Sequence, residues 1–369
     1  MKILLVLDSL GSGGAQNLFC NLAKELARLN FSVDIFTYSP GCFYRDDLRQ
    51  SGVNVIMGGA KTNGFSRKIL AELVSCIRQE KYNLVISAMH SPSFYASLAR
   101  FFVPIPQLVV CELSSSHSKS SRMRKILFYF STLFADRVIC NSKAERKLMS
   151  KLPGRSGKLS SIWNGYSLDG FQFKPPGKSS RLKLLVVGRI AYPKNGVRLF
   201  QGLQIFEQRH GWCPRLLWAG RRDFDTKSAE MYEEMLAIRN SSPGLQDAIE
   251  LLGETKDMAS LYHTSDGLIH MSIYEGLPNA ICEAMLYGCP VLASAVCDHP
   301  IVLGENRERG LLADPYSAES IADCIEIFQK MLPAERNSIA SNAREFALEN
   351  FDITKMADKY IHPELVRDD

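Results

Sequence analysis

Two glutamates flank the predicted start of a helix in the second half of the chain. In the segment EGLPNAICEAMLYG, Glu275 precedes the helix and Glu283 lies one to two turns inside it. Pro278 is typical of a first helical turn, and Gly288 of a helix end. The backbone N–H groups at 277–280 could then bind an anion, with the carboxylates suited to sugar hydroxyls beside it. The alternative is two surface acids that the helix dipole favours.

Two basic residues follow a predicted buried strand. Arg189 and Lys194 lie in the loop GRIAYPKNG, directly after the apolar run Leu182–Val187. Cations fixed at such a position can stabilise a leaving group that gains negative charge, such as a diphosphate. Without further context, two solvated loop cations are the simpler interpretation.

The first half offers weaker candidates. Gly11-Ser12-Gly13-Gly14 is a glycine-rich turn between a predicted strand and a helix. Its glycines would allow a ligand to approach the backbone closely, but a tight turn without a ligand gives the same pattern. His90 follows the predicted strand Leu84–Ala88 and could approach a substrate, although a lone histidine is more often structural.

Metal binding is not predicted. Asp223-Phe224-Asp225 has the form of a DxD metal motif, but it lies in a charged loop and is interpreted as solvated surface. The ten cysteines include no CxxC pair, which indicates reduced thiols in a cytoplasm. We also expect no signal peptide and no membrane span, because no apolar run is long enough.

A basic and aromatic segment at 117–135 could place the protein at a membrane surface. Lys119, Arg122, Arg124 and Lys125 are followed by the apolar run ILFYF. Cations beside aromatic residues suit the headgroup boundary of an anionic bilayer. An ordinary helix with one core face and one solvated basic face is the alternative.

The elements that must position these residues form two similar series. Apolar runs that alternate with helical stretches predict parallel strands covered by helices on both faces, which is a doubly wound α/β architecture. The predicted strands of the first half are Lys2–Leu7, Phe31–Thr37, Val53–Met57, Leu84–Ala88, Gln107–Cys111 and Arg137–Cys140. Those of the second half are Leu182–Val187, Arg215–Ala219, Ile249–Leu252, Gly267–His270 and Pro290–Ala293. The polar segment Phe173–Arg181 is typical of a linker and is predicted to connect the two halves.

Composition agrees with two folded domains and adds a charge asymmetry. The chain has 369 residues, of which 46% are hydrophobic and 22% charged, so extensive disorder is excluded. Residues 1–176 hold 23 Lys and Arg against 11 Asp and Glu, whereas the remainder holds 21 against 28. A basic first half indicates an anionic partner: nucleic acid, an acidic lipid surface or a phosphorylated substrate.

The paired-glutamate segment EGLPNAICEAMLYGCPVLAS resembles the carboxy-terminal signature of glycosyltransferase family 4. The segments LDSLGSGGAQ, VICNSKAERKLM, IWNGYSLDGF, VVGRIAYPKNG and GLLADPYSAESIADCI occur in matching order, so the resemblance covers nearly the whole chain. It implies the GT-B fold, with two Rossmann-like domains that face an interdomain cleft. The expected domains are 1–172 for the acceptor and 173–350 for the donor, with a helix at 351–369 that returns to the first domain.

The resemblance also implies roles for individual residues. Catalysis is assigned to Glu275, Arg189, Lys194 and His90. Donor binding is assigned to Glu283, Gly13, Gly14, Gly253, Gly276, Leu277, Pro278 and Asn279. Some relatives have a catalytic histidine after the strand that here ends in Cys111-Glu112-Leu113, and His117 comes later. Glu112 is the candidate that could substitute for it in the first domain.

The sequence therefore predicts a retaining glycosyltransferase that needs no metal or other cofactor. It would move a hexose or N-acetylhexosamine from a nucleotide donor, expected to be UDP-linked, to a glycan or lipid-linked acceptor in surface polysaccharide synthesis. The expected location is the cytoplasm, with peripheral contact to the inner face of the membrane through 117–135. The alternatives are a nucleotide-sugar epimerase or hydrolase on the same scaffold, or a nucleic-acid-binding module. No nucleic-acid motif accompanies the charge, so no nucleic-acid partner is expected.

Overall fold

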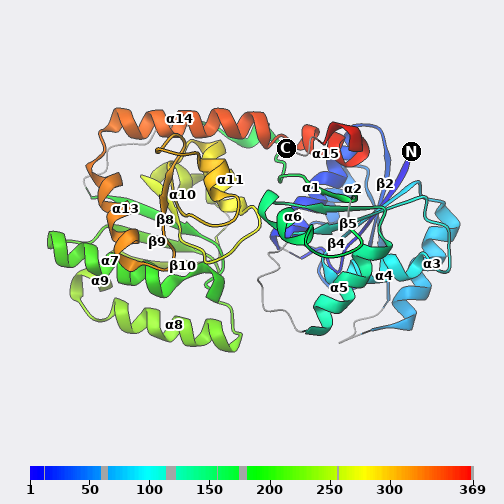
Figure 1. Ribbon diagram of the computed structural model, residues 1–369, viewed down its shortest axis with the longest axis horizontal. Helices are drawn as coiled ribbons and strands as arrows, with labels where there is room; N and C mark the ends of the chain where they lie inside the picture. The colour runs from blue at the N-terminus through cyan, green and yellow to red at the C-terminus, as the bar shows by residue number, and fades with distance from the viewer. Residues whose placement is uncertain are drawn as a thin grey trace. The chain divides into compact units, whose positions relative to one another are not determined.

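Strands and helices alternate along the chain in the computed structural model, and the strands form two separate sheets (Figure 1). The structure describes residues 1–11, 13–59, 65–113, 122–155, 157–173, 181–255 and 257–366, without the side chains of 122–125. One unit comprises Met1–Ser167 with Phe351–Asp369, and the other comprises Leu168–Asn350. The chain thus passes between the units five residues before the predicted position at 172, inside the stretch that precedes the linker.

The first unit contains a seven-stranded parallel sheet in the order β3-β2-β1-β4-β5-β6-β7. Its strands are β1 (Lys2–Val6), β2 (Ser32–Thr37), β3 (Asn54–Met57), β4 (Leu84–Ala88), β5 (Gln107–Glu112), β6 (Arg137–Cys140) and β7 (Leu159–Ser161). Six were predicted. The seventh, β7, was missed because its sequence LSS is short and carries no apolar run.

The second unit contains a six-stranded parallel sheet in the order β10-β9-β8-β11-β12-β13. Its strands are β8 (Lys183–Val187), β9 (Arg215–Ala219), β10 (Ile249–Gly253), β11 (Gly267–His270), β12 (Val291–Ser294) and β13 (Leu311–Ala313). The doubly wound α/β architecture is confirmed in both units. The three-residue edge strand β13 was not predicted.

Helices cover both faces of each sheet, which explains why the strands are continuously apolar. In β1, Ile3 and Leu5 belong to one core cluster, whereas Leu4 and Val6 belong to the cluster on the other face. The first unit has α1 (Gly14–Arg28), α2 (Arg45–Gln50), α3 (Arg67–Glu80), α4 (His90–Ala99), α5 (Arg122–Phe134), α6 (Lys143–Met149) and α15 (Ile353–Ile361). The second has α7 (Gly196–His210), α8 (Thr226–Arg239), α9 (Pro243–Ala248), α10 (Met258–Thr264), α11 (Asn279–Tyr287), α12 (His299–Leu303), α13 (Ala318–Lys330) and α14 (Pro333–Asn350). Among the described residues, no helix combines the length and apolarity that crossing a bilayer requires.

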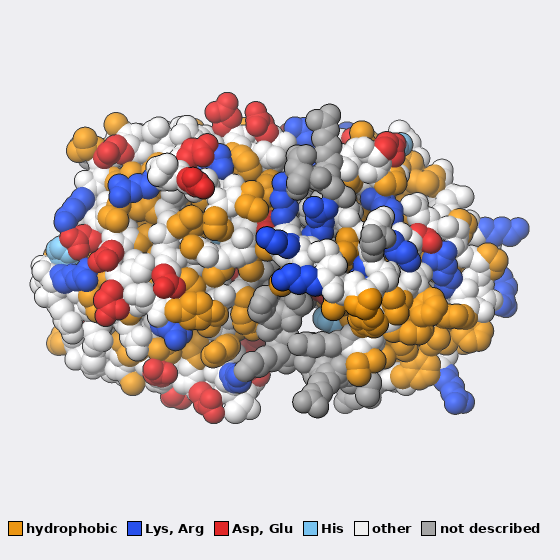
Figure 2. All heavy atoms as spheres, viewed as in Figure 1, with side chains coloured by type: hydrophobic (Ala, Val, Ile, Leu, Met, Phe, Trp, Pro, Cys, Tyr) orange, Lys and Arg blue, Asp and Glu red, His pale blue; other side chains and the backbone are white. Residues whose placement is uncertain are grey.

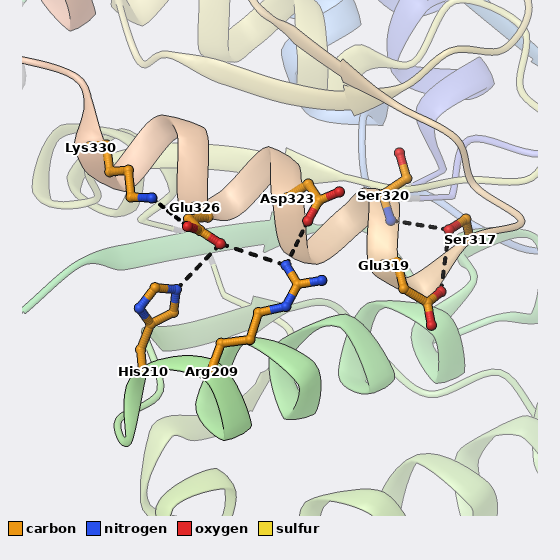
Figure 3. A network of polar contacts seen from close by, with 8 residues as sticks. All are labelled: Arg209, His210, Ser317, Glu319, Ser320, Asp323, Glu326 and Lys330. Atoms are coloured by element: carbon orange, nitrogen blue, oxygen red, sulfur yellow. Dashed lines mark hydrogen bonds and ion pairs between the residues drawn. The ribbon is translucent and has the colours of Figure 1, made fainter.

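A polar network joins α7 to α13 at the surface of the second unit (Figure 3). Arg209 lies 2.5 Å from an Asp323 carboxylate oxygen and 3.6 Å from Glu326. Glu326 also contacts His210, at 3.4 Å, and pairs with Lys330. Exposed ion pairs of this kind contribute little to stability, so the buried apolar residues between the helices hold them together.

The C-terminal helix α15 packs on α1 within the first unit. The Tyr360 ring meets Phe19 edge-on at 6.4 Å, and the Thr354 hydroxyl donates to Glu25 at 2.6 Å. The predicted return of the last segment to the first domain corresponds to this packing. The close packing of α15 requires a glycine at position 165, because a Cβ there would lie 2.7 Å from the Ile353 Cα.

We predict that Gly165→Ala lowers the free energy of unfolding by about 1–3 kcal/mol, since the added methyl group would push α15 outwards. Chemical denaturation followed by circular dichroism measures the change. Gly170→Ala is the matched control, because a Cβ at Gly170 meets nothing within 4 Å. Equal stability of the two variants would contradict the assigned role of Gly165.

Candidate functional site

The loop between β11 and α11 holds the first predicted catalytic residue. Glu275 lies in this loop, and α11 begins at Asn279. Pro278 was expected inside the first helical turn, but it is the N-cap residue, with an extended backbone at φ −75° and ψ 128°. Gly288 ends the helix in the left-handed conformation, at φ 73°, as predicted. Gly276, Leu277 and Pro278 are buried, so the loop packs firmly against its own unit.

Three groups converge on the Oε1 atom of Glu275. Lys194 forms an ion pair with it, the Ser272 hydroxyl donates to it at 2.8 Å, and His270 Nε2 lies 3.4 Å away. Burial works to raise the pKa of the Glu275 carboxyl, but Lys194 and His270 outweigh it and hold the pKa well below the usual range. Glu275 is therefore ionised at neutral pH.

Further polar groups fix Ser272 and His270 at the carboxyl end of β11, and one of them, Ser294, ends the neighbouring strand β12. Ser272 Oγ lies 3.1 Å from His270 Nε2, and Ser294 donates its hydroxyl proton to the Ser272 carbonyl at 2.6 Å. His299 Nδ1 lies 2.8 Å from the Ser294 carbonyl oxygen. Burial lowers the pKa of His270 and lowers that of His299 to about 3, so both imidazoles are neutral. Sequence reasoning missed these residues, although polar residues at the ends of apolar strands were a signal.

Lys194 is held by the loop that follows β8. This loop contains the short 3₁₀ helix η2 (Tyr192–Lys194) and ends at Asn195, which has a left-handed φ of 59°. The Asn195 side-chain amide donates to the carbonyls of Met271, at 3.0 Å, and Pro315, at 2.7 Å. These bonds tie the two loops that carry Lys194 and Glu275 to each other.

Glycine makes room for the lysine side chain. Gly188 has a φ of 139°, and a Cβ there would lie 3.1 Å from the Lys194 Cε. The lysine stem therefore lies directly over the end of β8. At the end of the neighbouring strand β9, Gly220 leaves room for the Gly188 carbonyl oxygen, which would lie 2.0 Å from a Cβ at that position. The Gly220 N–H donates a hydrogen bond to the Gly253 carbonyl, at the end of β10, at 2.8 Å. The predicted donor residue Gly253 thus lies in a row of glycines at the strand ends.

Arg189 lies apart from the cluster around Glu275. Its side chain is 58% exposed and pairs with Asp223, not with the Lys194–Glu275 cluster. The interpretation of Asp223-Phe224-Asp225 as solvated surface was incomplete, because Asp225 caps α8 by accepting from the Ser228 N–H at 3.2 Å. Among the described residues, no group of three or more His, Cys, Asp or Glu side chains could hold a metal ion.

Glu283 lies in a less polar environment than Glu275. Its Oε2 atom accepts a hydrogen bond from the Tyr262 hydroxyl at 3.0 Å. Burial raises the pKa of Glu283 to about 7, and the tyrosine bond only partly opposes this. Tyr262 comes from α10 and stacks on Tyr287 at 5.2 Å. Sequence reasoning did not single out this tyrosine.

The predicted residues of the first unit lie at the carboxyl ends of its strands or just after them. Gly13 is the N-cap residue of α1, and Gly14 is its first residue. His90 opens α4, and its ring packs on Phe128 with the ring centres 5.1 Å apart. Glu112 is the buried last residue of β5. Ser12, His117, Lys119 and the side chains of Arg122, Arg124 and Lys125 lie outside the described part of the chain.

Two family models match the chain in succession. One, described as "Glycosyltransferase Family 4", matches residues 12–169, and the other, described as "Glycosyl transferases group 1", matches residues 181–329. The chain belongs to glycosyltransferase family 4. It is a glycosyltransferase, and the paired glutamates occupy the second of the two matched regions.

Individual relatives agree with this assignment. The chain is 25% identical to the amylovoran biosynthesis glycosyltransferase AmsD of Erwinia amylovora over 79% of this chain and 80% of that protein. It is 22% identical to the UDP-Gal:alpha-D-GlcNAc-diphosphoundecaprenol alpha-1,3-galactosyltransferase of Escherichia coli, over 79% of this chain and 77% of that protein. The crystal structure of Anabaena Alr3699/HepE in complex with UDP-glucose superposes with a TM-score of 0.82 at 22% identity, over 99% of each chain. The architecture of the glycosyltransferase is thus GT-B, as predicted.

The raised pKa of Glu283 predicts a pH-dependent stability. An unfolded glutamate loses its proton near pH 4.5, but the folded one keeps it to about pH 7. The protonated carboxyl therefore contributes stability that is complete below pH 4.5 and is lost as the pH rises through 7. We expect Glu283→Gln to be increasingly stable relative to the wild type between these limits, measured as thermal unfolding midpoints. Glu305→Gln, at an exposed site, is the control, and an equal trend in both variants would contradict the assignment.

Proposed function

We propose that this glycosyltransferase moves a sugar from a UDP-linked donor to a lipid-linked glycan during bacterial surface polysaccharide synthesis, with retention of the anomeric configuration. The observation that carries the proposal is the ion pair of Lys194 with the ionised Glu275, beside the start of α11. The name of the galactosyltransferase relative, which includes a diphosphoundecaprenol-linked sugar, supports a lipid-linked acceptor, and that of AmsD supports a role in polysaccharide synthesis. The sugar is a hexose or an N-acetylhexosamine.

Each group of the site has a role in this proposal. The second oxygen of Glu275 accepts hydrogen bonds from hydroxyls of the donor sugar, since its Oε1 atom is already engaged by three protein groups. Glu283 accepts from the ribose hydroxyls. Lys194, Arg189 and the backbone at 276–279 stabilise the diphosphate as it departs, because cations placed where charge develops lower the barrier. Arg189 is largely exposed and pairs with Asp223. In the proposal, it leaves Asp223 and binds the diphosphate when the donor is present.

The reaction is proposed as a front-face substitution. The bond from the anomeric carbon to the diphosphate breaks, and a bond to the acceptor hydroxyl oxygen forms on the same face. The acceptor proton passes to a phosphate oxygen of the leaving group, so no protein nucleophile is needed. Gly13, Gly14, His90 and Glu112 are the proposed contributions of the first unit. No metal ion or other cofactor takes part in the proposal, and the enzyme is placed in the cytoplasm, peripheral to the membrane.

Substitution of the ion pair is the direct test of the site. We expect Glu275→Gln and Lys194→Ala each to lower kcat/KM by roughly 10²–10³-fold, which is typical for the loss of one preorganised group. Transfer of radiolabelled sugar to a lipid-linked acceptor measures the rate. Glu250→Gln is the matched control, because Glu250 lies in an exposed ion pair with Arg215 in the same unit. Near-normal turnover in both site variants, with folding intact, would contradict the site.

The donor is identified by thermal unfolding in a panel of nucleotide sugars. A ligand present at 100 times its Kd stabilises the folded enzyme by about 2.7 kcal/mol, so the true donor should stand out. We expect a UDP-sugar to give the largest shift, and Glu283→Gln to reduce it. Incubation with this donor but no acceptor separates transfer from epimerisation or hydrolysis. Rapid donor consumption without acceptor, or a product of inverted configuration by NMR, would refute the proposed reaction.

A further inference from the structure

Five phenylalanine rings from α4, α5 and the segments beside α3 and α4 make a continuous surface cluster in the first unit. This aromatic belt consists of Phe65, Phe94, Phe101, Phe130 and Phe134. Neighbouring rings lie 4.5–6.4 Å apart, from Phe65 through Phe94 and Phe130 to Phe101 and Phe134. The belt thus joins residues that are up to 69 positions apart in the sequence.

The belt is open to solvent over much of its area. Phe65 is 55% exposed, Phe101 is 59% exposed and Phe134 is 37% exposed. Phe102, at 57%, and Ile126, at 61%, add exposed apolar surface on the same segments. Figure 2 shows hydrophobic side chains gathered over the part of the surface where Figure 1 places α3, α4 and α5. A contiguous apolar patch of this kind marks an interaction surface.

Basic side chains accompany the belt. Arg100 donates to the Phe134 carbonyl at 2.8 Å, and Arg78 donates to the Phe102 carbonyl at 3.3 Å. Arg67 and Lys68 are exposed directly after Phe65. Among the described side chains of residues 65–134, five are Lys or Arg and three are Glu, of which Glu112 is buried. The surface therefore combines exposed aromatic rings with an excess of positive charge.

We propose that the aromatic belt and its cations dock the first unit onto an anionic lipid bilayer. Aromatic rings suit the headgroup region, and each cation near a negatively charged bilayer adds attraction. A second copy of the chain fits this surface less well, because two similarly charged rims would repel each other. The choice of a bilayer rests in part on the proposed function, since a lipid-linked acceptor is carried there. The described part of the predicted contact, from Ile126 to Phe134, becomes part of a larger surface that begins at Phe65.

Vesicle sedimentation tests the docking surface. The probes are phosphatidylcholine vesicles with and without phosphatidylglycerol, and the full-length enzyme should bind only those that contain the anionic lipid. Phe101→Ser with Phe102→Ser should reduce the partition coefficient at least tenfold. Arg67→Gln with Lys68→Gln should reduce it by about fivefold per cation, an effect that added salt diminishes in the wild type.

Two control variants match these changes in the same unit. Phe43→Ser removes a ring that is 63% exposed outside the belt, and Arg49→Gln removes an exposed charge on α2. Both should bind vesicles as the wild type does. Equal binding to neutral vesicles, equal binding of the belt variants, or dimerisation that the Phe101 variant abolishes in the absence of vesicle binding would overturn the proposal.

A second readout separates this proposal from the proposed reaction. The belt variants should keep the full thermal shift with the UDP-sugar, since Glu275, Glu283 and Lys194 lie in the other unit and neither Gly13 nor Gly14 belongs to the belt. Failure of the enzyme to bind any nucleotide sugar, together with normal vesicle binding, would refute the reaction alone. A normal thermal shift with unchanged vesicle binding by the belt variants would refute the docking surface alone.

Discussion

The ion pair between Lys194 and Glu275 is the interaction on which the second unit's site depends. Removing a carboxylate from water is costly unless opposite charge and hydrogen bonds compensate it. Lys194, Ser272 and His270 together provide that compensation at a single oxygen atom. Because the two charged residues are 81 positions apart, the loops after β8 and β11 must both be in place before either charge is stabilised. The bonds from Asn195 to neighbouring carbonyls supply that constraint.

The same segment places two carboxylates in opposite protonation regimes. Glu275 is ionised because a lysine faces it, whereas burial raises the pKa of Glu283 to about 7 and only a tyrosine hydroxyl opposes the rise. Eight positions of sequence separate the two residues, so composition alone does not explain the difference. It arises because the helix start intervenes: Glu275 faces the ends of the strands, and Glu283 faces α10. A fixed negative charge and a titratable acceptor are thereby held at the two sides of one helix terminus.

The sequence was most informative where one local pattern determined a structure. Buried parallel strands are continuous apolar runs, so eleven of them could be located, whereas the three-residue strands β7 and β13 carry too short a pattern. Glu275, Lys194 and Arg189 were singled out by residue type and position, and their roles were assigned through the resemblance to the family. Their partners were not, because Ser272, Tyr262 and Asp223 acquire their roles only through contacts that folding creates. The segment predicted as a membrane contact, 117–135, includes two rings of the aromatic belt, Phe130 and Phe134, and the rings from 65–101 join them only in three dimensions.

The uneven distribution of charge suits two different kinds of anion recognition. The second half of the chain is acidic overall, with 28 Asp and Glu against 21 Lys and Arg, although it contains the residues proposed to bind the diphosphate. In the proposed reaction, attraction of a nucleotide there comes from short contacts to Lys194 and Arg189, which salt screens weakly once water is excluded. In the basic first half, Arg67 and Lys68 are among the described cations that are exposed. Charge spread in this way acts over about a Debye length, which suits an extended anionic surface better than a single small ligand.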